Sequence, residues 1–201
     1  MPAIITIAQM KGGVSKSTIA FNLTFLFAET LKVAVLDTDL QGSISHLLEE
    51  NENINIITFP DKIEMLRSVS ADIIIIDTPG YLSAQLPALL KISDLIIVPT
   101  KTGFWDYNAL KSMIVLINEA LIYKPSLKWG VILTMVNPQA KLSKEITSLL
   151  KDLEAPMFKT QITQRVSYVR SLIMGGILKS DDLKAKYEII NLADEVITLL
   201  Q

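Results

Sequence analysis

The chain has 201 residues, of which 50 % are hydrophobic and 20 % charged, and its formal net charge is -2 at pH 7. This length and composition suit one folded domain with a substantial core, and the slightly acidic balance offers no general attraction to nucleic acid. The chain contains no cysteine, which excludes a disulfide framework, a thiolate metal site and an iron–sulfur cluster.

Short apolar runs alternate with helix-like segments along the whole chain. We expect strands at 3–8, 32–36, 54–59, 72–76, 95–98, 128–136 and 157–160, and helices at 18–30, 60–69, 82–91, 104–123, 141–153, 164–173 and 182–200. The apolar runs are too short to cross a bilayer, and the N-terminus has no basic secretory signal, so we expect a cytoplasmic protein. The alternation predicts an α/β fold, a mostly parallel twisted sheet with helices on both faces, in a single domain over residues 1–201.

The first connection, residues 9–18, joins the first strand to the first helix and reads QMKGGVSKST. Glycine-rich loops in this place bind phosphates, because backbone N–H groups and the positive end of the helix dipole point into one concavity. We expect Lys16 to contact the terminal phosphates of a nucleotide and the hydroxyl of Ser17 to bind Mg2+. The expected nucleotide-binding residues are Lys11, Gly12, Gly13, Val14, Ser15, Lys16, Ser17 and Thr18.

Carboxylates gather where two of the expected strands end. Asp37 and Asp39 follow the second strand, and Asp77 closes the most continuous apolar run, in the manner of a Walker B strand. Ligands of open parallel sheets bind at the carboxyl ends of the strands. We therefore expect Asp37 and Asp77 to hold the waters of a magnesium ion that Ser17 binds directly.

The loop departs from the usual GxxxxGK[ST] pattern at Met10 and Ser15, where glycines are expected, but it has a second lysine, Lys11, before two glycines. In this it resembles the deviant Walker A motif, KGGxGK[ST], of the ParA/MinD family of P-loop ATPases, although Ser15 stands where the family has glycine. The resemblance implies ATP and Mg2+ as ligands. It also implies that Lys11 reaches across a dimer interface to the phosphates of the partner subunit, so that Lys11 and Lys16 both act in catalysis.

Three other segments resemble the same family. Residues 37–43, DTDLQGS, are similar to its DxDPQG segment, whose second aspartate, here Asp39, orients the attacking water; the alternative is that Asp39 only caps a turn. Residues 77–80, DTPG, match DTPP except at Gly80, which we expect to make this switch more flexible. Residues 133–137 look like the segment that lines the adenine pocket, so Asn137 is a candidate for the base, although Asn-Pro is equally an ordinary turn.

The C-terminal part of the chain is locally basic, with nine basic and five acidic residues between 141 and 186. Resemblance to small plasmid-type ParA proteins implies a partition ATPase that binds DNA nonspecifically as an ATP-bound homodimer, associates with the nucleoid, lacks an N-terminal helix-turn-helix extension, and is stimulated by a centromere-binding, ParB-type partner. The candidate DNA contacts are Lys144, Lys159, Arg165, Arg170 and Lys179. A solvated helical surface is the alternative, because acids are interspersed.

Two other functions compete with partition. A MinD-like positioning ATPase would bind membrane through a basic amphipathic C-terminal helix, but residues 192–201, LADEVITLLQ, contain two acids and no basic residue, so we expect no membrane partner. A metabolic P-loop ligase, similar to dethiobiotin synthetase, would lack the early lysine. Binding assays with DNA and with anionic liposomes distinguish the three functions.

Overall fold

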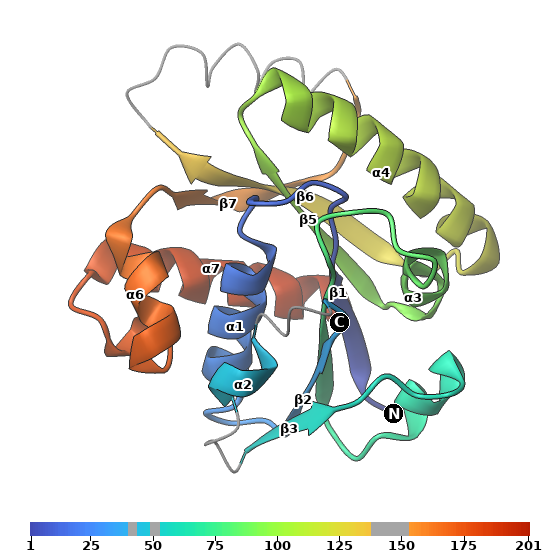
Figure 1. Cartoon of the computed structure of the whole chain (residues 1–201), viewed down its shortest axis with the longest axis horizontal. Coiled ribbons are helices and arrows are strands. Elements are labelled where there is room, and N and C mark those ends of the chain that lie inside the picture. The colour runs from blue at the N-terminus through green and yellow to red at the C-terminus, as the bar shows by residue number, and fades with distance from the viewer. Residues whose placement is uncertain (40–43, 49–52, 138–152) are drawn as a thin grey trace.

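The computed structural model describes residues 1–39, 44–48, 53–137 and 153–201 (Figure 1). Its strands are β1 (Ala3–Ile7), β2 (Val33–Asp37), β3 (Ile54–Ile57), β4 (Ile73–Asp77), β5 (Leu95–Lys101), β6 (Lys128–Val136) and β7 (Met157–Thr163). They form one sheet in the order β3-β2-β4-β1-β5-β6-β7, and each strand runs parallel to its neighbours. The predicted parallel α/β fold is confirmed.

Helices cover both faces of the sheet, as Figure 1 shows. One face packs against α1 (Lys16–Phe27), α6 (Val166–Met174) and α7 (Leu183–Leu200), and the other against α3 (Leu86–Ile92), α4 (Phe104–Tyr123) and the 3-10 helix η1 (Ile63–Ser68). Alternate residues of a strand point to opposite faces. Ile5 and Ile7 of β1 therefore pack with α1, while Ile4 joins the core with α3 and η1.

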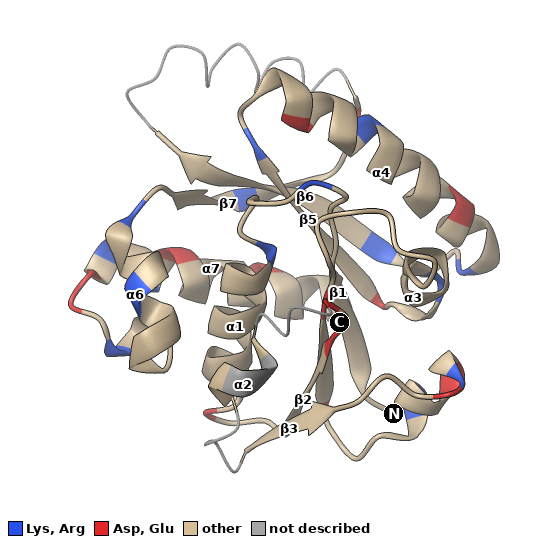
Figure 2. Ribbon diagram, viewed as in Figure 1, with Lys and Arg blue, Asp and Glu red and all other residues tan. Residues whose placement is uncertain are grey.

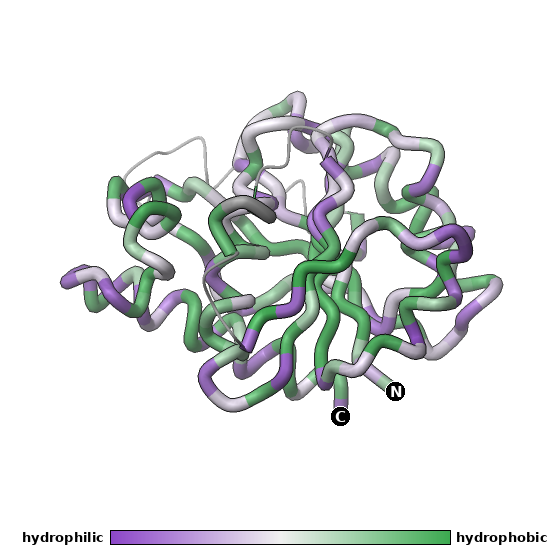
Figure 3. The backbone as a smooth tube through the Cα atoms, turned by 60° about the horizontal axis from the view of Figure 1, so that its bottom comes forward, coloured by the Kyte–Doolittle hydropathy of each residue, from purple (hydrophilic) through white to green (hydrophobic). Residues whose placement is uncertain are grey.

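The strands are apolar along almost their whole length because both faces are covered. In β4, all five residues from Ile73 to Asp77 are buried. Figure 3 shows this as hydrophobic strands in the middle of the molecule, surrounded by helices and loops of mixed polarity. No helix in the described part of the chain combines the length and the apolar character that crossing a membrane requires.

The β7 strand is longer than the sequence predicts, since it continues to Thr163 instead of ending at Thr160. The extension depends on two carboxylates of α7. Glu195 accepts hydrogen bonds from the backbone N–H groups of Lys159 and Thr160, at 2.7 and 2.8 Å, and Glu188 accepts one from Thr163 at 3.1 Å. These contacts satisfy donors of a strand at the edge of the sheet, which local sequence patterns do not reveal.

Other element boundaries also differ from the prediction. The helix expected at 82–91 begins at Leu86, the segment at 60–69 forms the six-residue η1, and two short helices, α2 (Ser45–Leu48) and η2 (Ile177–Lys179), were not expected. The helix predicted at 141–153 falls almost entirely on residues 138–152, outside the described part of the chain.

Candidate functional site

The glycine-rich loop connects β1 to α1 at the carboxyl end of the sheet, where the sequence places it. Val14 anchors the loop to the sheet. Its side chain is buried, and its backbone carbonyl accepts a hydrogen bond from the hydroxyl of Thr134 in β6, at 3.1 Å. Val14 can therefore contact a ligand only through its backbone. Gly13 and Ser15 both have a φ of 69°, the left-handed conformation that favours glycine.

Replacing Ser15 with glycine is expected to stabilise the free protein by up to about 1 kcal/mol, because a side chain in the left-handed region costs roughly 1–2 kcal/mol and glycine loses part of that gain in the unfolded chain. Thermal unfolding should then shift upward by a few degrees at most. Ser112, inside α4, is the matched control, since Ser112→Gly should lower stability. Equal losses for both variants would contradict the strain at Ser15.

Lys16 occupies a cavity of about 320 Å3 beside the loop. The described residues that line it are Gly12, Gly13, Ser15, Lys16, Ser17, Thr18, Asp39, Thr78, Gly80 and Met135. Lys16 is only 6 % exposed, and its ammonium donates to the backbone carbonyl of Lys11 at 3.0 Å. Burial lowers the pKa of Lys16, while Asp77 and Asp39 oppose that shift. The cavity therefore holds a cation where phosphates would lie.

Asp37 and Asp77 are brought together by the pairing of β2 with β4, where they occupy the same register. The carboxylate of Asp37 accepts hydrogen bonds from the backbone N–H groups of Asp39 and Ile44, each at 3.0 Å. Asp77 is fully buried, and neither of its carboxylate oxygens has a hydrogen-bond partner among the described residues. These oxygens, with the hydroxyl of Ser17 nearby, are the hard ligands that Mg2+ and its waters prefer.

The described residues contain no group of three or more acidic or histidine side chains placed to hold a metal by themselves. A magnesium ion would therefore take most of its ligands from phosphate oxygens and water, with Ser17 as the direct protein ligand and Asp77 bonding to its waters. This donor set fits the expected ion, since Mg2+ usually keeps several waters and binds few protein groups.

Burial raises the pKa of Asp77 to about 7, against the opposing influence of the Ser17 hydroxyl and the Lys16 ammonium, and Asp37 and Asp39 raise it further. Between about pH 4 and pH 7 the folded state binds more protons here than the unfolded state does. Stability of the nucleotide-free protein should therefore fall as pH rises from about 4 to 7, by at most about 1.4 kcal/mol per pH unit.

Thermal unfolding of the wild type and of Asp77→Asn over this pH range tests the assignment. The asparagine variant cannot ionise, so its stability should change less with pH, and its affinity for ATP should respond less to Mg2+. If the stability of Asp77→Asn changed with pH as steeply as that of the wild type, the titrating group would be another residue.

Lys11 lies outside the cavity that Lys16 occupies. Its ammonium makes an ion pair of 2.8 Å with Asp106, in the first turn of α4, and its side chain is 31 % exposed. Asp106 is 5 % exposed, and its other carboxylate oxygen has no hydrogen-bond partner among the described residues. The two lysines of the loop thus occupy different places, one inside the phosphate cavity and one at the surface.

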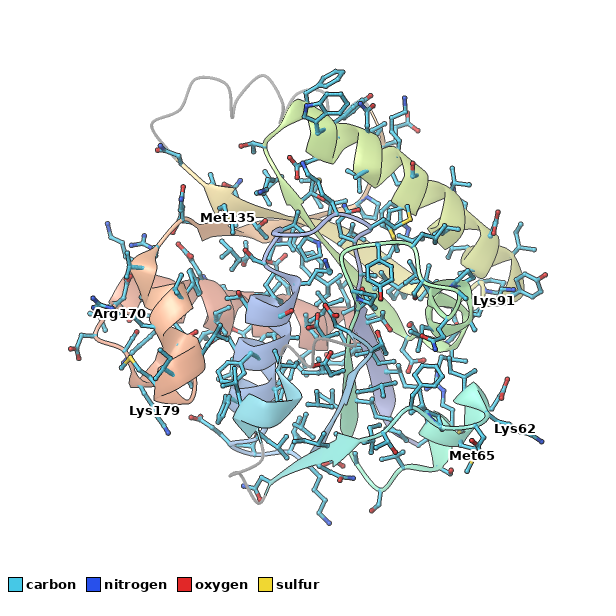
Figure 4. The ribbon with its side chains drawn as sticks, viewed as in Figure 1. Lys62, Met65, Lys91, Met135, Arg170 and Lys179 are labelled. Carbon is cyan, nitrogen blue, oxygen red and sulfur yellow. The ribbon has the colours of Figure 1, made fainter. Side chains whose placement is uncertain are left out.

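A second cavity, of about 280 Å3, adjoins the first and shares Ser15, Thr18 and Met135 with it. The rest of its described lining comes from the β7–α6 junction, namely Ile162, Thr163, Gln164, Arg165, Val166, Tyr168 and Val169. A mostly apolar hollow with a few polar groups suits a nucleotide base and sugar. Figure 4 shows Met135 at the end of β6, near this junction.

The sequence pointed to Asn137 for the base, whereas the described lining of this cavity comes from β7 and α6. Asn137 is an exposed residue just after β6, and it is not among the described residues that line either cavity. A contact between Asn137 and a base therefore remains a prediction. A nucleotide-binding role for the β7–α6 residues was not predicted, because residues 162–169 carry no recognisable nucleotide-binding motif.

A third hollow, of about 190 Å3, lies on the other side of Asp39. Its described lining is Asp37, Thr38, Asp39, Phe59, Tyr81, Ser83 and Gln85. Asp39 borders both this hollow and the phosphate cavity. The phosphate cavity therefore lies between the second cavity, with which it shares Ser15, Thr18 and Met135, and the third hollow. An extended nucleotide with its base in the second cavity would therefore direct its terminal phosphate toward Asp39.

Gly80 has a structural role that differs from the expected flexibility. A Cβ atom at this position would lie 2.7 Å from the Cα of Gly12 and 2.9 Å from its nitrogen. The segment after β4 thus packs directly against the glycine-rich loop, and only a glycine permits that approach.

Residues 5–176 match the CobQ/CobB/MinD/ParA nucleotide binding domain. The chain belongs to this family. It is 30 % identical over 182 residues to the maintenance of carboxysome distribution protein A of Gloeobacter kilaueensis, covering 87 % of this chain and 82 % of that protein. Members of this ParA/MinD group are positioning ATPases.

Two solved structures share the fold. The structure of apo McdA from Cyanothece superposes with a TM-score of 0.82 at 17 % identity, over 98 % of this chain and all of that one. A putative plasmid partition protein from Borrelia burgdorferi, solved with AMPPNP, has a TM-score of 0.75 at 24 % identity, over 99 % of each chain. The match to a nucleotide binding domain agrees with the nucleotide ligand expected from the sequence.

The candidate DNA-binding residues are placed unevenly. Arg170 and Lys179 are exposed and project outward from the α6–η2 region, as Figure 4 shows. Arg165 instead belongs to an internal network, with Asp182 at 3.5 Å, Glu188 at 3.6 Å and the hydroxyl of Thr163 at 2.6 Å. Lys159 is exposed on β7 but shares a hollow with Glu188, Asp194 and Glu195. Lys144 lies outside the described residues.

Proposed function

We propose that this chain is an ATP-dependent positioning ATPase of the ParA type, which binds ATP and Mg2+, dimerises around two nucleotides and hydrolyses ATP slowly. The observation that carries the proposal is the separation of the two lysines of the loop. Lys16 occupies the phosphate cavity, while Lys11 is held at the surface by Asp106. A second lysine at the surface of a phosphate site is suited to complete the site of another subunit.

The order of the three cavities supports hydrolysis at one end of the bound nucleotide. Lys16 and the backbone N–H groups of the loop offset phosphate charge, and Ser17 binds Mg2+. Asp39 borders the cavity at the end away from the base, so its carboxylate can hold a water in line with the terminal phosphate. Lys11 of a second copy adds positive charge when the dimer forms.

We further propose that the ATP-bound dimer binds DNA without sequence preference, associates with the nucleoid, and leaves the DNA after hydrolysis. Arg170 and Lys179 are the described candidates that remain available for phosphate contacts, whereas Arg165 is committed to Asp182 and Glu188. In Figure 2, basic residues gather in the α6–η2 region at one end of the molecule. Contacts of this kind weaken steeply with salt.

The cargo is either DNA, through a centromere-binding partner, or a large protein assembly. The relative from Borrelia burgdorferi favours DNA, and the carboxysome-distribution relative, at 30 % identity, favours a protein assembly. In both cases a partner bound to the cargo would stimulate hydrolysis. A membrane role is less well supported, because Asp194 and Glu195 place acids near the end of α7.

Co-sedimentation with DNA or with anionic liposomes, each with a nonhydrolysable ATP analogue at low salt, tests the proposed DNA binding. We expect retention on DNA and none on liposomes. The double variant Arg170→Glu with Lys179→Glu should weaken DNA binding by at least about tenfold, because it reverses two phosphate contacts. Absence of DNA retention by the wild type would contradict DNA binding, and retention on liposomes would support the membrane alternative.

The matched control is Lys62→Glu with Lys128→Glu, which changes the net charge equally. Lys62 lies at the opposite end of the molecule from Arg170 in Figure 4, and Lys128 begins β6, at the end of the sheet away from the phosphate cavity. This variant should bind DNA nearly as the wild type does, with only the small loss expected from net charge. Equal losses in the two double variants would contradict a binding surface at α6 and η2.

A further inference from the structure

Glu188 of α7 lies behind the wall of the second cavity. It is not among the described residues that line this cavity. Its carboxylate instead contacts three residues that do line it, namely Thr163, Arg165 and Tyr168. The side chain of Glu188 is only 16 % exposed. A carboxylate so far removed from water has to be compensated by its neighbours, and here those neighbours form the cavity wall.

The hydrogen bonds of this part of the wall end at that one carboxylate. One oxygen of Glu188 accepts from the hydroxyl of Thr163 at 2.7 Å, and the same hydroxyl accepts from the Nε of Arg165 at 2.6 Å. The other oxygen accepts from the backbone N–H of Thr163 at 3.1 Å and from the hydroxyl of Tyr168 at 2.6 Å. Burial raises the pKa of Tyr168, and the hydrogen bond to Glu188 raises it further, so this phenol stays protonated and donates.

A fixed wall favours binding, because the ligand does not then have to order the side chains that it meets. Arg165 has the most freedom to lose, since a free arginine side chain has many rotamers. It is held by Thr163, which Glu188 fixes, and by Asp182 at 3.5 Å. Glu188 also lies 3.6 Å from the Nε of Arg165 and compensates its charge. The polar part of the wall is therefore arranged before a nucleotide arrives.

Glu195 provides a comparison within the same helix. It lies about two turns beyond Glu188 and accepts from the backbone N–H groups of Lys159 and Thr160. Neither of these two residues is among the described residues that line the second cavity. Both glutamates therefore fasten β7 to α7, but only Glu188 also fixes the cavity wall.

We propose that Glu188 is a positioning residue for the nucleotide, which holds Thr163, Arg165 and Tyr168 in place for the base and sugar of ATP. The inference rests on the proposed function, since it takes ATP as the ligand and the second cavity as the place of its base. Glu188 itself does not touch the nucleotide. It therefore acts on the affinity for the base end of ATP and leaves the phosphate end, at Lys16, unchanged.

Calorimetric titration of the full chain with Mg2+ and either ATP or inorganic tripolyphosphate tests this role, because tripolyphosphate has the phosphates and no base. Glu188→Gln keeps the size of the side chain but removes its charge and places an N–H donor where Glu188 only accepts. It should weaken ATP binding about tenfold and leave tripolyphosphate binding unchanged. Glu195→Gln is the matched control and should alter neither affinity. In steady-state hydrolysis, Glu188→Gln should raise KM for ATP and leave kcat unchanged.

Tyr168→Phe gives a second variant, which keeps the ring in the wall and removes the hydroxyl that donates to Glu188. It should weaken ATP binding about threefold, again without an effect on tripolyphosphate. Its effect should be smaller in the Glu188→Gln background than in the wild type, because the two residues act through one contact. This variant supplies the test if Glu188→Gln does not fold, and an unchanged affinity for ATP would then contradict the proposal.

The remaining outcomes separate this inference from the proposed function. Undiminished ATP affinity in Glu188→Gln, or an equal loss in Glu195→Gln, would overturn the role of Glu188 and leave the proposed function standing. A parallel loss of tripolyphosphate binding would also overturn it, since the change would then reach the phosphate loop. If the wild type binds ATP no more tightly than tripolyphosphate, the second cavity does not hold the base and the inference is wrong. If the wild type binds neither, the proposed function is wrong as well.

Discussion

Asp39→Ala should bind ATP and dimerise like the wild type while hydrolysing ATP at least about 100-fold more slowly. Asp39 borders both the phosphate cavity and the hollow beyond it, so its carboxylate is placed to orient a water rather than to hold the nucleotide. The turn after β2 should survive the change, because the carboxylate that caps this turn belongs to Asp37, which accepts from the N–H groups of Asp39 and Ile44.

Phosphate release, nucleotide binding and sedimentation, measured on the same variant, distinguish whether Asp39 orients the attacking water or holds the nucleotide. Asp61→Ala is a suitable control, since Asp61 is exposed and lies between β3 and η1. Undiminished hydrolysis by Asp39→Ala would show that another group positions the water. A loss of ATP binding would instead assign Asp39 to the nucleotide or its metal.

Lys16→Ala is expected to weaken ATP binding by about 100-fold or more, because charged hydrogen bonds to phosphates contribute strongly in a buried site. The free protein should not lose stability for lack of this charge. Burial already disfavours the ammonium, as the lowered pKa of Lys16 indicates, and its only hydrogen bond in the described structure is to the carbonyl of Lys11. Titration with a fluorescent ATP analogue measures the binding loss.

Lys11→Ala is the matched comparison, since it removes the same charge from the same loop. Lys11 is paired with Asp106 and is not among the described residues lining the phosphate cavity. The monomer should therefore still bind ATP, whereas dimerisation and turnover should fail. Equal loss of monomer binding in the two variants would mean that Lys11 contacts the nucleotide of its own chain.

The ion pair between Lys11 and Asp106 has a consequence for assembly. A lysine held by a carboxylate of its own chain must exchange that partner for phosphate when a dimer forms. Asp106 is buried, so the exchange leaves a buried carboxylate without its cation unless nearby groups move. The α4 helix begins next to this pair, so nucleotide-dependent dimerisation should alter its first turn.

The parallel sheet and the phosphate loop could be predicted from the amino-acid sequence, since both depend on contiguous residues. Short apolar runs between polar residues, such as the four isoleucines at 73–76, specify buried parallel strands whatever their neighbours are. Residues 9–18 contain the glycines and lysines of the loop. Ser15 departs from the motif in the sequence, and it has the left-handed φ that favours glycine. Asp77 was placed at a strand end by the same local pattern.

The way in which distant segments complete the site depends on the folded chain and could not be predicted. The second cavity joins Met135 to residues 162–169, the ion pair joins Lys11 to Asp106, and β7 is lengthened by carboxylates of α7. Strand order brings these groups together, and no local pattern encodes it. For the same reason, the sequence does not show that Arg165 is paired while other basic candidates are exposed. Its partners Asp182 and Glu188 belong to the first part of α7 and its N-terminal cap, and they reach Arg165 only because α6 and α7 pack together.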